Sequence, residues 1–281
     1  HIESWQVHQS LKKFVGEDTS ENYNLSNWDD AFDNNPNSWQ DHIHIRANIK
    51  KYPEEIARRR LSKAKYMEIM REHFQGLPDK DNFNFDDEVK VWQAAIANSM
   101  LQLYSDYIKE YIEMCLKIKP FDPMWFLNSP VITELAEQIL HFFEERGVTD
   151  KIEQLKKMKE FLYSKYFFNT PYVLISSLFN AGISRKFVYN ARKEPKSGDY
   201  YDVQIISHLL PYCDAMLIDN ETRAILTEAP INLERKFKTR LFSMSKKEEF
   251  IEYLYELKRQ MPSEINRAVI EVYGELHTPS K

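Results

Sequence analysis

Three aspartates lie close together in the segment YYDVQIISHLLPYCDAMLID. Its residue pattern places Asp202 at the start of a helix, Asp214 at the turn from that helix to a strand, and Asp219 at the end of the strand. Ligands bind at the carboxyl ends of strands in open α/β sheets, so we expect Asp202 and Asp219 to point toward the same sheet edge. Two carboxylates there would offer the hard oxygen ligands that Mg²⁺ and Mn²⁺ prefer. Such a cation favours hydrolysis of a phosphodiester, because it activates water and neutralises developing charge.

Each of these aspartates also has an ordinary structural explanation. An Asp often caps a helix or closes a turn by accepting hydrogen bonds from nearby backbone N–H groups. The chemical hypothesis assigns two roles to these aspartates. Asp202 and Asp219 are the metal ligands, and Asp214 is a flanking acid that orients the site.

The elements around the aspartates alternate between helix and strand. A short helix over DVQIISHLLPYC precedes the apolar run AMLID, and one or two helical turns over NETRAIL precede a second apolar run, RLFSM. An amphipathic helix follows over SKKEEFIEYLYELKRQM, with Ser245 as its cap and Glu248 three positions later. This order of helix, strand, helix, strand and helix predicts a parallel α/β sheet.

Helices are expected over most of the preceding sequence. Apolar residues recur at three- and four-residue spacing between Pro53 and residue 119, which predicts two long helices. Further helices are predicted over 130–147, from about residue 150, and over 170–182, with Gly147 and Gly182 as their ends. Before Pro53 the sequence is polar and irregular, apart from HIHIRANI, whose alternation is typical of a half-buried strand.

Residues 199–226, DYYDVQIISHLLPYCDAMLIDNETRAIL, resemble the C-terminal motif of the PIN-like nuclease superfamily. That motif has an acid opening a helix, an acid ahead of a strand and a last acid just after the strand. Position by position, Asp202 resembles the acid at the helix start, Asp214 the flanking acid, and Asp219 the acid after the fourth strand. The resemblance implies a nuclease that depends on Mg²⁺ or Mn²⁺ and most often cuts RNA.

The resemblance also defines the expected fold class, a helix-rich α/β protein. It would consist of a PIN-like parallel sheet with a large helical insertion over about 53–180 and a C-terminal α/β part over 181–281. PIN-like proteins have a second acid near a helix start, and Glu134 is the residue of this chain that resembles it. The alternative interpretation is that Glu134 is an ordinary exposed glutamate on a helix. The family's first strand, which ends in Asp, has no counterpart in HIESWQVHQSLKKF.

A basic segment precedes the aspartates along the chain. It contains Arg185, Lys186, Arg192 and Lys193, with Tyr189 between them. Cationic side chains contact nucleic-acid phosphates, and an aromatic ring can stack on a base. The segment therefore predicts a contact with nucleic acid beside the aspartates.

Composition excludes several other classes of protein. The 281 residues carry 38 Lys and Arg against 43 Asp and Glu, and the net charge of −5 argues against a protein that coats nucleic acid through bulk charge. The six glycines are too far apart for a glycine-rich phosphate loop, and the two cysteines suggest neither a zinc site nor a disulfide framework. No apolar stretch has the length of a membrane span and no signal profile opens the sequence, so we expect a cytoplasmic protein.

Two functions remain open from the sequence. The first is a metal-dependent endoribonuclease in which Asp202 and Asp219 bind the cation and Glu134 is a further ligand or a water-activating acid. The second is a non-catalytic helical protein with a degenerate PIN-like sheet, which binds a protein partner or a second copy of itself through its aromatic-rich insertion. The missing first Asp favours the second function.

Overall fold

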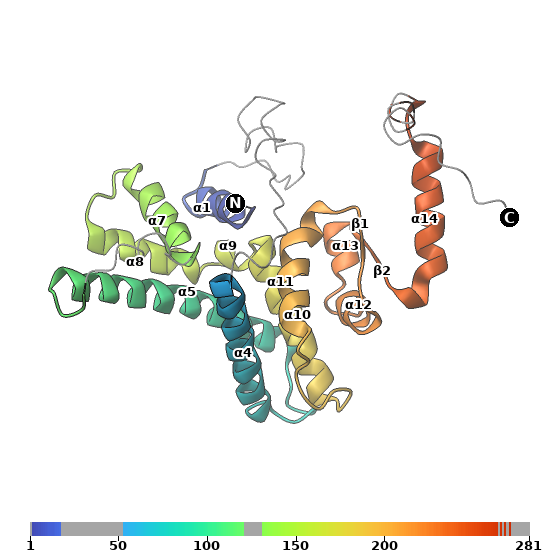
Figure 1. The fold of residues 1–281 in the computed structure, drawn as a ribbon, viewed down its shortest axis with the longest axis horizontal. Coiled ribbons are helices and arrows are strands. Elements are labelled where there is room, and N and C mark those ends of the chain that lie inside the picture. Colours follow the sequence, from blue (N-terminus) through green and yellow to red (C-terminus); the bar gives the residue numbers. More distant parts are fainter. Residues whose placement is uncertain are drawn as a thin grey trace.

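The computed structural model describes residues 2–17, 53–120 and 131–263, together with 265, 267 and 270. Helices dominate, and a small sheet lies toward the C-terminal end (Figure 1). The helices ahead of the sheet region are α1 (Ile2–Phe14), α4 (Pro53–Gln75), α5 (Phe85–Cys115), α7 (Val131–Glu144), α8 (Lys151–Leu162), α9 (Lys165–Phe168) and α10 (Pro171–Val188). The sheet region contains α11 (Asp199–Leu209), β1 (Ala215–Leu217), α12 (Asn220–Thr227), α13 (Leu233–Phe237), β2 (Arg240–Phe242) and α14 (Lys247–Gln260).

The two strands pair in parallel. Ala215 lies opposite Arg240, and Leu217 lies opposite Phe242. Parallel strands need a long crossover connection, which α12 and α13 provide here. The alternation of helix and strand in the sequence thus correctly predicted a helix-rich α/β fold with a parallel strand pair.

Two apolar clusters hold the described part of the chain together. The first joins α4, α5, α10 and α11 to the sheet region, and its fully buried members include Met70, Ile175, Ile183, Leu210, Leu226 and Leu233. The second joins α1, α5, α7, α8 and α9 and is rich in phenylalanine, with Phe142, Phe143, Phe161 and Phe167 all buried. Helices α5 and α10 each contribute some residues to the first cluster and others to the second. The helices before residue 181 therefore share a core with the α/β part.

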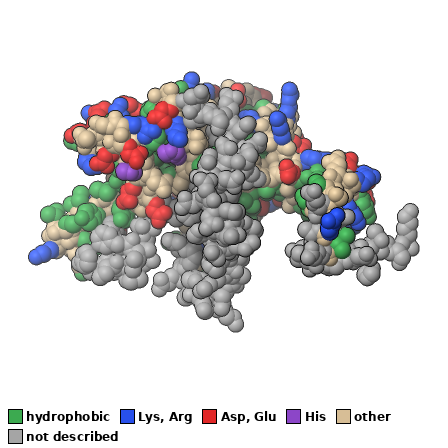
Figure 2. All heavy atoms as spheres, turned by 90° about the horizontal axis from the view of Figure 1, so that it is seen from above, with side chains coloured by type: hydrophobic (Ala, Val, Ile, Leu, Met, Phe, Trp, Pro, Cys, Tyr) green, Lys and Arg blue, Asp and Glu red, His purple; other side chains and the backbone are tan. Residues whose placement is uncertain are grey.

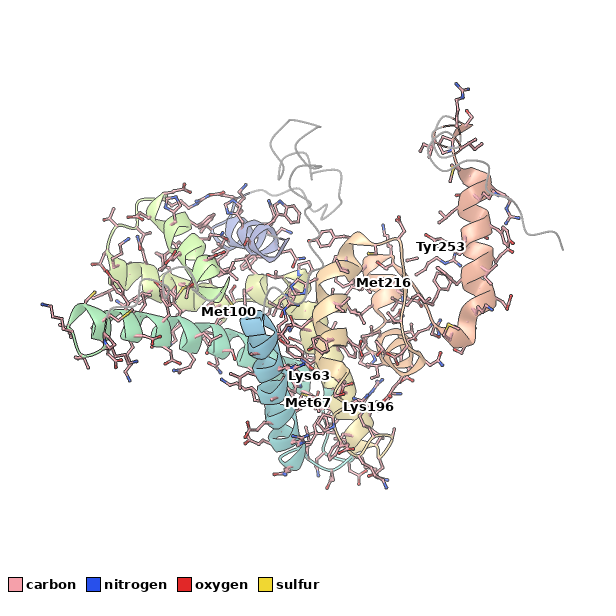
Figure 3. All side chains as sticks on the ribbon, viewed as in Figure 1. Lys63, Met67, Met100, Lys196, Met216 and Tyr253 are labelled. Carbon is pink, nitrogen blue, oxygen red and sulfur yellow. The ribbon has the colours of Figure 1, made fainter. Side chains whose placement is uncertain are left out.

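Helix α14 stands at one end of the molecule in Figure 1. Its contact with the sheet is aromatic: the ring of Phe242 on β2 lies 5.2 Å from the ring of Phe250 and 5.4 Å from that of Tyr253. Tyr253 lies on the side of α14 that faces the sheet, and Met216 of β1 packs against the first apolar cluster (Figure 3). Ser245, predicted as the cap of this helix, instead lies in a 3-10 turn before it, because α14 begins at Lys247 with Lys246 as its N-cap.

Several helix ends follow their expected signals. Thr170 and Pro171 begin α10, and Gly147 follows α7 in the left-handed conformation with φ of 84° that glycine adopts easily. The prediction that Gly182 ends its helix was wrong, because α10 continues to Val188. Gly182 lies where α10 approaches Ile225 of α12, so the glycine serves close helix packing rather than helix termination.

The first residues of the chain also differ from the prediction of irregular structure. Residues 2–14 form α1, because Val7 and Leu11 recur at helical spacing and enter the second apolar cluster. The buried polar side chains of this helix find partners: Ser10 Oγ lies 2.8 Å from Thr170 Oγ1. The HIHIRANI segment and the predicted helix start before Val131 lie outside the described residues. None of the described helices combines the length and the apolar character needed to span a bilayer.

Replacing Gly182 by Ala should destabilise the protein. An added Cβ would lie 2.5 Å from Ile225 Cγ2 and 2.8 Å from Ile231 Cδ1, closer than van der Waals contact permits. Overpacking of this kind costs about 1–3 kcal/mol, against a helix-propensity gain of about 1 kcal/mol for Ala over Gly. We expect a net loss of about 1 kcal/mol in the free energy of unfolding, measured by urea denaturation. Gly76→Ala is the control, since its Cβ would meet only one ordinary contact at 3.6 Å; equal stability of the two variants would contradict the packing argument.

Candidate functional site

Asp202 and Asp219 are brought together by the starts of two helices. Asp202 lies in the first turn of α11, and Asp219 is the N-cap of α12, two residues after the end of β1. The negative charge of Asp219 contributes to raising the pKa of Asp202, which places the two carboxylates within electrostatic reach of each other. Both aspartates therefore lie at helix starts, and Asp219 also lies just beyond the carboxyl end of β1, where the sequence pattern placed it.

The Asp202 carboxylate is half-buried and poorly compensated. It forms no hydrogen bond or ion pair with the described residues, and its Oδ2 lies 3.5 Å from the position that a Cβ on Gly198 would occupy. Burial raises the pKa of Asp202, and the negative charges of Asp219 and Asp199 raise it further, while Arg192 lowers it. An ionised Asp202 is thus costly unless a positive charge joins it.

Asp219 is held in place by a capping interaction. Its Oδ1 accepts hydrogen bonds from the backbone N–H groups of Glu221 and Thr222, at 2.9 and 3.0 Å. Burial would raise the pKa of Asp219, but the hydrogen bonds from Thr222 and Glu221 and the charge of Lys196 outweigh it, so the pKa is lowered. Asp219 therefore fills the helix-capping role that the sequence left open, and it stays ionised beside Asp202.

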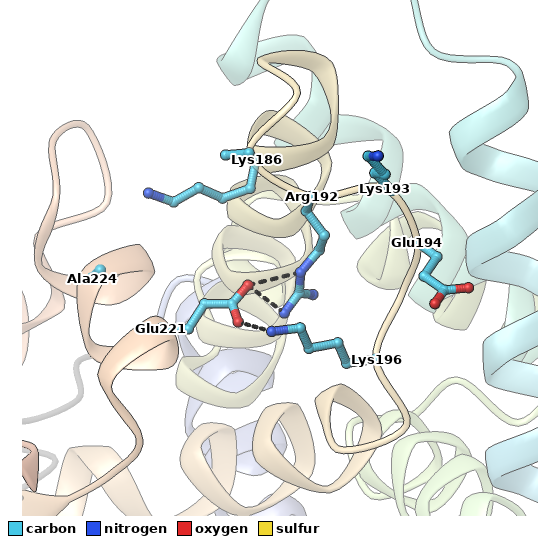
Figure 4. Close-up of a pocket in the computed structure, with 8 residues that line it drawn as sticks. Lys186, Arg192, Lys193, Glu194, Lys196, Glu221 and Ala224 are labelled. Atoms are coloured by element: carbon cyan, nitrogen blue, oxygen red, sulfur yellow. Dashed lines mark hydrogen bonds and ion pairs between the residues drawn. The ribbon is translucent and has the colours of Figure 1, made fainter.

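A buried arginine fixes the two helix starts relative to each other. Arg192 Nη1 donates to Asp199 Oδ2 at 2.7 Å. Its Nε donates to Glu221 Oε1 at 2.9 Å (Figure 4). Its side chain is only 5% exposed. Lys196 pairs with the other oxygen of Glu221. Since Asp199 opens α11 and Glu221 lies in the first turn of α12, this network positions the helix ends that carry the aspartate pair.

Helix α4 contributes a partly buried tyrosine near Asp199 and Asp202. Tyr66 Oη donates to Asn180 Oδ1 at 2.8 Å, and its ring lies 5.4 Å from that of Tyr200. Burial raises the pKa of Tyr66, and the nearby charges of Asp199 and Asp202 raise it further. Tyr66 therefore stays protonated as a hydrogen-bond donor, and its hydrogen bond to Asn180 links α4 to α10.

Three of the four basic residues predicted to contact nucleic acid are engaged in internal ion pairs. Arg185 and Lys186 both pair with Glu228, at 2.9 and 3.0 Å, and Arg192 is buried as described above. Lys193 is exposed and has no ion pair with any described residue. The face shown in Figure 2 carries positive and negative side chains side by side rather than one extended basic patch among its described residues. Because three of its four cations are paired internally, the segment 185–193 does not form a uniformly basic surface.

The other two predicted acids lie away from the pair. Asp214 is exposed and precedes β1, so it stands at the end of that strand opposite to Asp219. Glu134 is an exposed residue in the first turn of α7, within the group of helices around the second cluster (Figure 1). Across residues 2–17, 53–120 and 131–263, no group of three or more His, Cys, Asp and Glu side chains is arranged to hold a metal ion.

Two carboxylates are nevertheless enough for one kind of cation. Mg²⁺ keeps several of its waters and is commonly held by one or two protein carboxylates together with phosphate oxygens of the substrate. Asp202 and Asp219 fit that donor set, because one carboxylate is unpartnered and the other is fixed and ionised. They do not form an all-protein metal cage.

Comparison with known proteins adds no relative to this description. No family model, curated protein or solved structure matches the chain. The class that fold and site define is a helix-rich α/β protein with a parallel strand pair and two aspartates at the adjoining helix starts.

Proposed function

We propose that this chain binds Mg²⁺ or Mn²⁺ at Asp202 and Asp219 and hydrolyses phosphodiester bonds, with RNA as its substrate. The observation that carries the proposal is the half-buried Asp202 carboxylate, which lies near the charge of Asp219 and forms no hydrogen bond or ion pair with the described residues. The choice of RNA follows from the resemblance of residues 199–226 to the PIN-like motif.

Each nearby residue has a distinct part in this proposal. When bound, the cation would supply a more acidic water and neutralise charge that develops on the phosphate. Asp202 and Asp219 would hold it, and the cap hydrogen bonds would keep Asp219 oriented. Arg192 acts as a positioning residue through Asp199. Asp214 has no part in the proposal, because it lies at the other end of β1.

Thermal unfolding with and without Mn²⁺ tests the cation site. Because the pKa of Asp202 is raised in the folded state, its ionisation costs stability, and this cost grows as the pH rises from the ordinary Asp range through the folded-state pKa. In EDTA at pH 7 we therefore expect Asp202→Asn to melt slightly higher than the wild type. This advantage should vanish near pH 3, where Asp202 is protonated in both states.

Adding Mn²⁺ should reverse that order. A cation at 100 times its dissociation constant stabilises the folded state by about 2.7 kcal/mol, and this gain should occur in the wild type and be lost in Asp202→Asn and Asp219→Asn. Asp214→Asn is the matched control and should gain as much as the wild type. If Mn²⁺ stabilises Asp202→Asn as strongly as the wild type, the proposed site is wrong.

The non-catalytic alternative has its own support. The described residues provide no third metal ligand, and three of the four predicted phosphate-binding residues are paired internally. A wild-type protein whose stability does not respond to Mn²⁺ or Mg²⁺ would favour this function, in which the helical region binds a protein partner.

A further inference from the structure

The two outer edges of the sheet differ in how their backbone groups are satisfied. On the outer edge of β2, side chains take the place of a further strand. The backbone N–H of Leu241 donates to Glu234 Oε1 at 2.7 Å, and the carbonyl of Leu241 accepts from Arg223 Nε at 2.7 Å. Because Arg223 lies on α12 and Glu234 on α13, the crossover between the strands also closes the outer edge of β2.

The outer edge of β1 is open. Ile218 donates to the carbonyl of Phe242 at 2.9 Å, and the carbonyl of Asp214 accepts a hydrogen bond from β2. Alternate residues of a strand direct their backbone groups to opposite edges, so Ala215 and Leu217 direct theirs away from β2. Among the described residues, no hydrogen-bond partner meets the N–H or C=O groups of these two residues. Four backbone groups are therefore available at this edge.

The side chains of β1 leave the same edge unprotected. Leu217 lies opposite Phe242 in the strand register, so the two side chains share the outer face of the sheet. Phe250 and Tyr253 of α14 cover Phe242, whereas Leu217 is 51% exposed. Edge strands that stay single usually carry Lys, Pro or other charged residues, and β1 has none. An open, uncharged edge of this kind favours pairing with a further strand.

We propose that the outer edge of β1 pairs with the same edge of a second copy of the chain. The two strands would run antiparallel about Met216, so that both sheets join into one of four strands. Ala215 of each copy then lies opposite Leu217 of the other, and their outward N–H and C=O groups form four hydrogen bonds. The small side chain of Ala215 leaves room for the larger one of Leu217. The edge is therefore complementary to itself, as a two-fold interface requires.

The charges near the edge are compatible with this pairing. Asp214 of one copy would lie opposite Ile218 of the other, so no like charges stand directly opposite each other. Only a short edge is paired, and the buried area should stay below the roughly 1,200 Å² of a stable interface. We therefore expect a weak dimer that forms as the protein concentration rises.

Sedimentation equilibrium tests the inference. Between about 1 and about 300 µM, the range in which weak complexes form, the average mass should rise from 33.6 kDa toward twice that value. Leu217→Pro should weaken the dimer at least about tenfold, because it removes two of the four hydrogen bonds between copies. The pairing of β1 with β2 should persist in this variant, since the N–H of Leu217 points away from β2.

A second variant leaves the backbone unchanged. Leu217→Lys places at the edge the kind of charge that keeps natural edge strands single, and it should also give a monomer. Ile152→Lys is the matched control, because it changes another exposed apolar residue, on α8, in the same way. This control should associate like the wild type. Urea unfolding of each variant shows whether it is folded.

Oxidation tests the register of the two strands. Opposite residues of a hydrogen-bonded antiparallel pair have Cα atoms about 5.5 Å apart, which a disulfide can bridge. A chain with Ala215→Cys and Leu217→Cys together should therefore form covalent dimers, and each single variant should do so no more than the wild type. Absence of the covalent dimer would contradict pairing about Met216.

The mass measurements decide whether a second copy is the partner. A mass of 33.6 kDa at every concentration overturns the inference, and so does a dimer that persists in both Leu217→Pro and Leu217→Lys. Neither measurement involves a cation or cleavage of RNA, so the result is independent of the proposed function.

Discussion

Replacing both Asp202 and Asp219 by Asn should reduce Mn²⁺-dependent cleavage of single-stranded RNA by at least about 100-fold. Changes to groups that merely orient a metal ligand already cost 10- to 100-fold in metal affinity or activity, so loss of both ligands should cost more. Asn is close to Asp in size but removes the charge, and the amide can still accept the cap hydrogen bonds of α12. The measurement is the initial cleavage rate of end-labelled RNA with Mn²⁺, with EDTA as the blank.

Two exposed acids serve as controls for that experiment. The sequence grouped Asp214 and Glu134 with the aspartate pair, whereas the structure places one at the opposite end of β1 and the other on α7. Asp214→Asn and Glu134→Gln should therefore cleave within about twofold of the wild type, since substitutions outside the site leave its electrostatics largely unchanged. Cleavage by the double variant at the wild-type rate would show that the activity does not belong to this site.

Replacing Glu88 by Ala should cause a large loss of stability, about 3 kcal/mol. Glu88 is buried on α5, where its Oε1 lies 2.6 Å from His73 Nε2 and accepts a hydrogen bond of 2.7 Å from Trp92 Nε1. Removing the carboxylate leaves the buried indole N–H without its acceptor, and such losses cost about 1–3 kcal/mol for each group. Urea unfolding followed by tryptophan fluorescence measures the effect. Glu88→Gln should lose less, because its amide oxygen can still accept from Trp92.

The Glu88 network also sets a pH dependence. Burial would raise the pKa of Glu88, but its hydrogen bonds with His73 and Trp92 outweigh that effect, and the pKa is lowered. A carboxyl with a lowered folded-state pKa contributes stability above the ordinary Glu range, and this contribution is lost as the pH falls through the folded-state value. The difference between wild type and Glu88→Ala should therefore shrink in acid. A difference that is unchanged down to pH 3 would contradict this role for the carboxylate.

Local signals in the sequence predicted many of the helix ends, although the cap signal at Ser245 was wrong. Thr170 and Pro171 begin a helix because a proline at the first helical position lacks only a donor that is unpaired there anyway. Gly182 misled the prediction, since nothing in its neighbours shows that Ile225 packs against it from another helix. Residues 2–14 were missed as a helix because their polar residues obscured the apolar spacing of Val7 and Leu11.

The sequence pattern pointed to the two aspartates of the candidate site, but not to the residues that hold them in place. Asp202 and Asp219 follow from the placement of acids at a helix start and after a strand, a pattern within one short segment. The salt bridge from Arg192 to Glu221 joins residues far apart in the chain. The residues next to Arg192 therefore suggested a contact with nucleic acid instead. The neighbouring acids Asp199 and Glu221 were the available signal, because buried arginines generally need carboxylate partners.

The two apolar clusters have a consequence for how this protein unfolds. On α5, Trp92 belongs to the first cluster and Met100 to the second. On α10, Ile175 belongs to the first cluster and Val173 to the second. Neither cluster can come apart without fraying a helix that the other cluster needs. The described helices and the strand pair should thus behave as one cooperative unit, in which loosening the phenylalanine-rich end also loosens the aspartate pair.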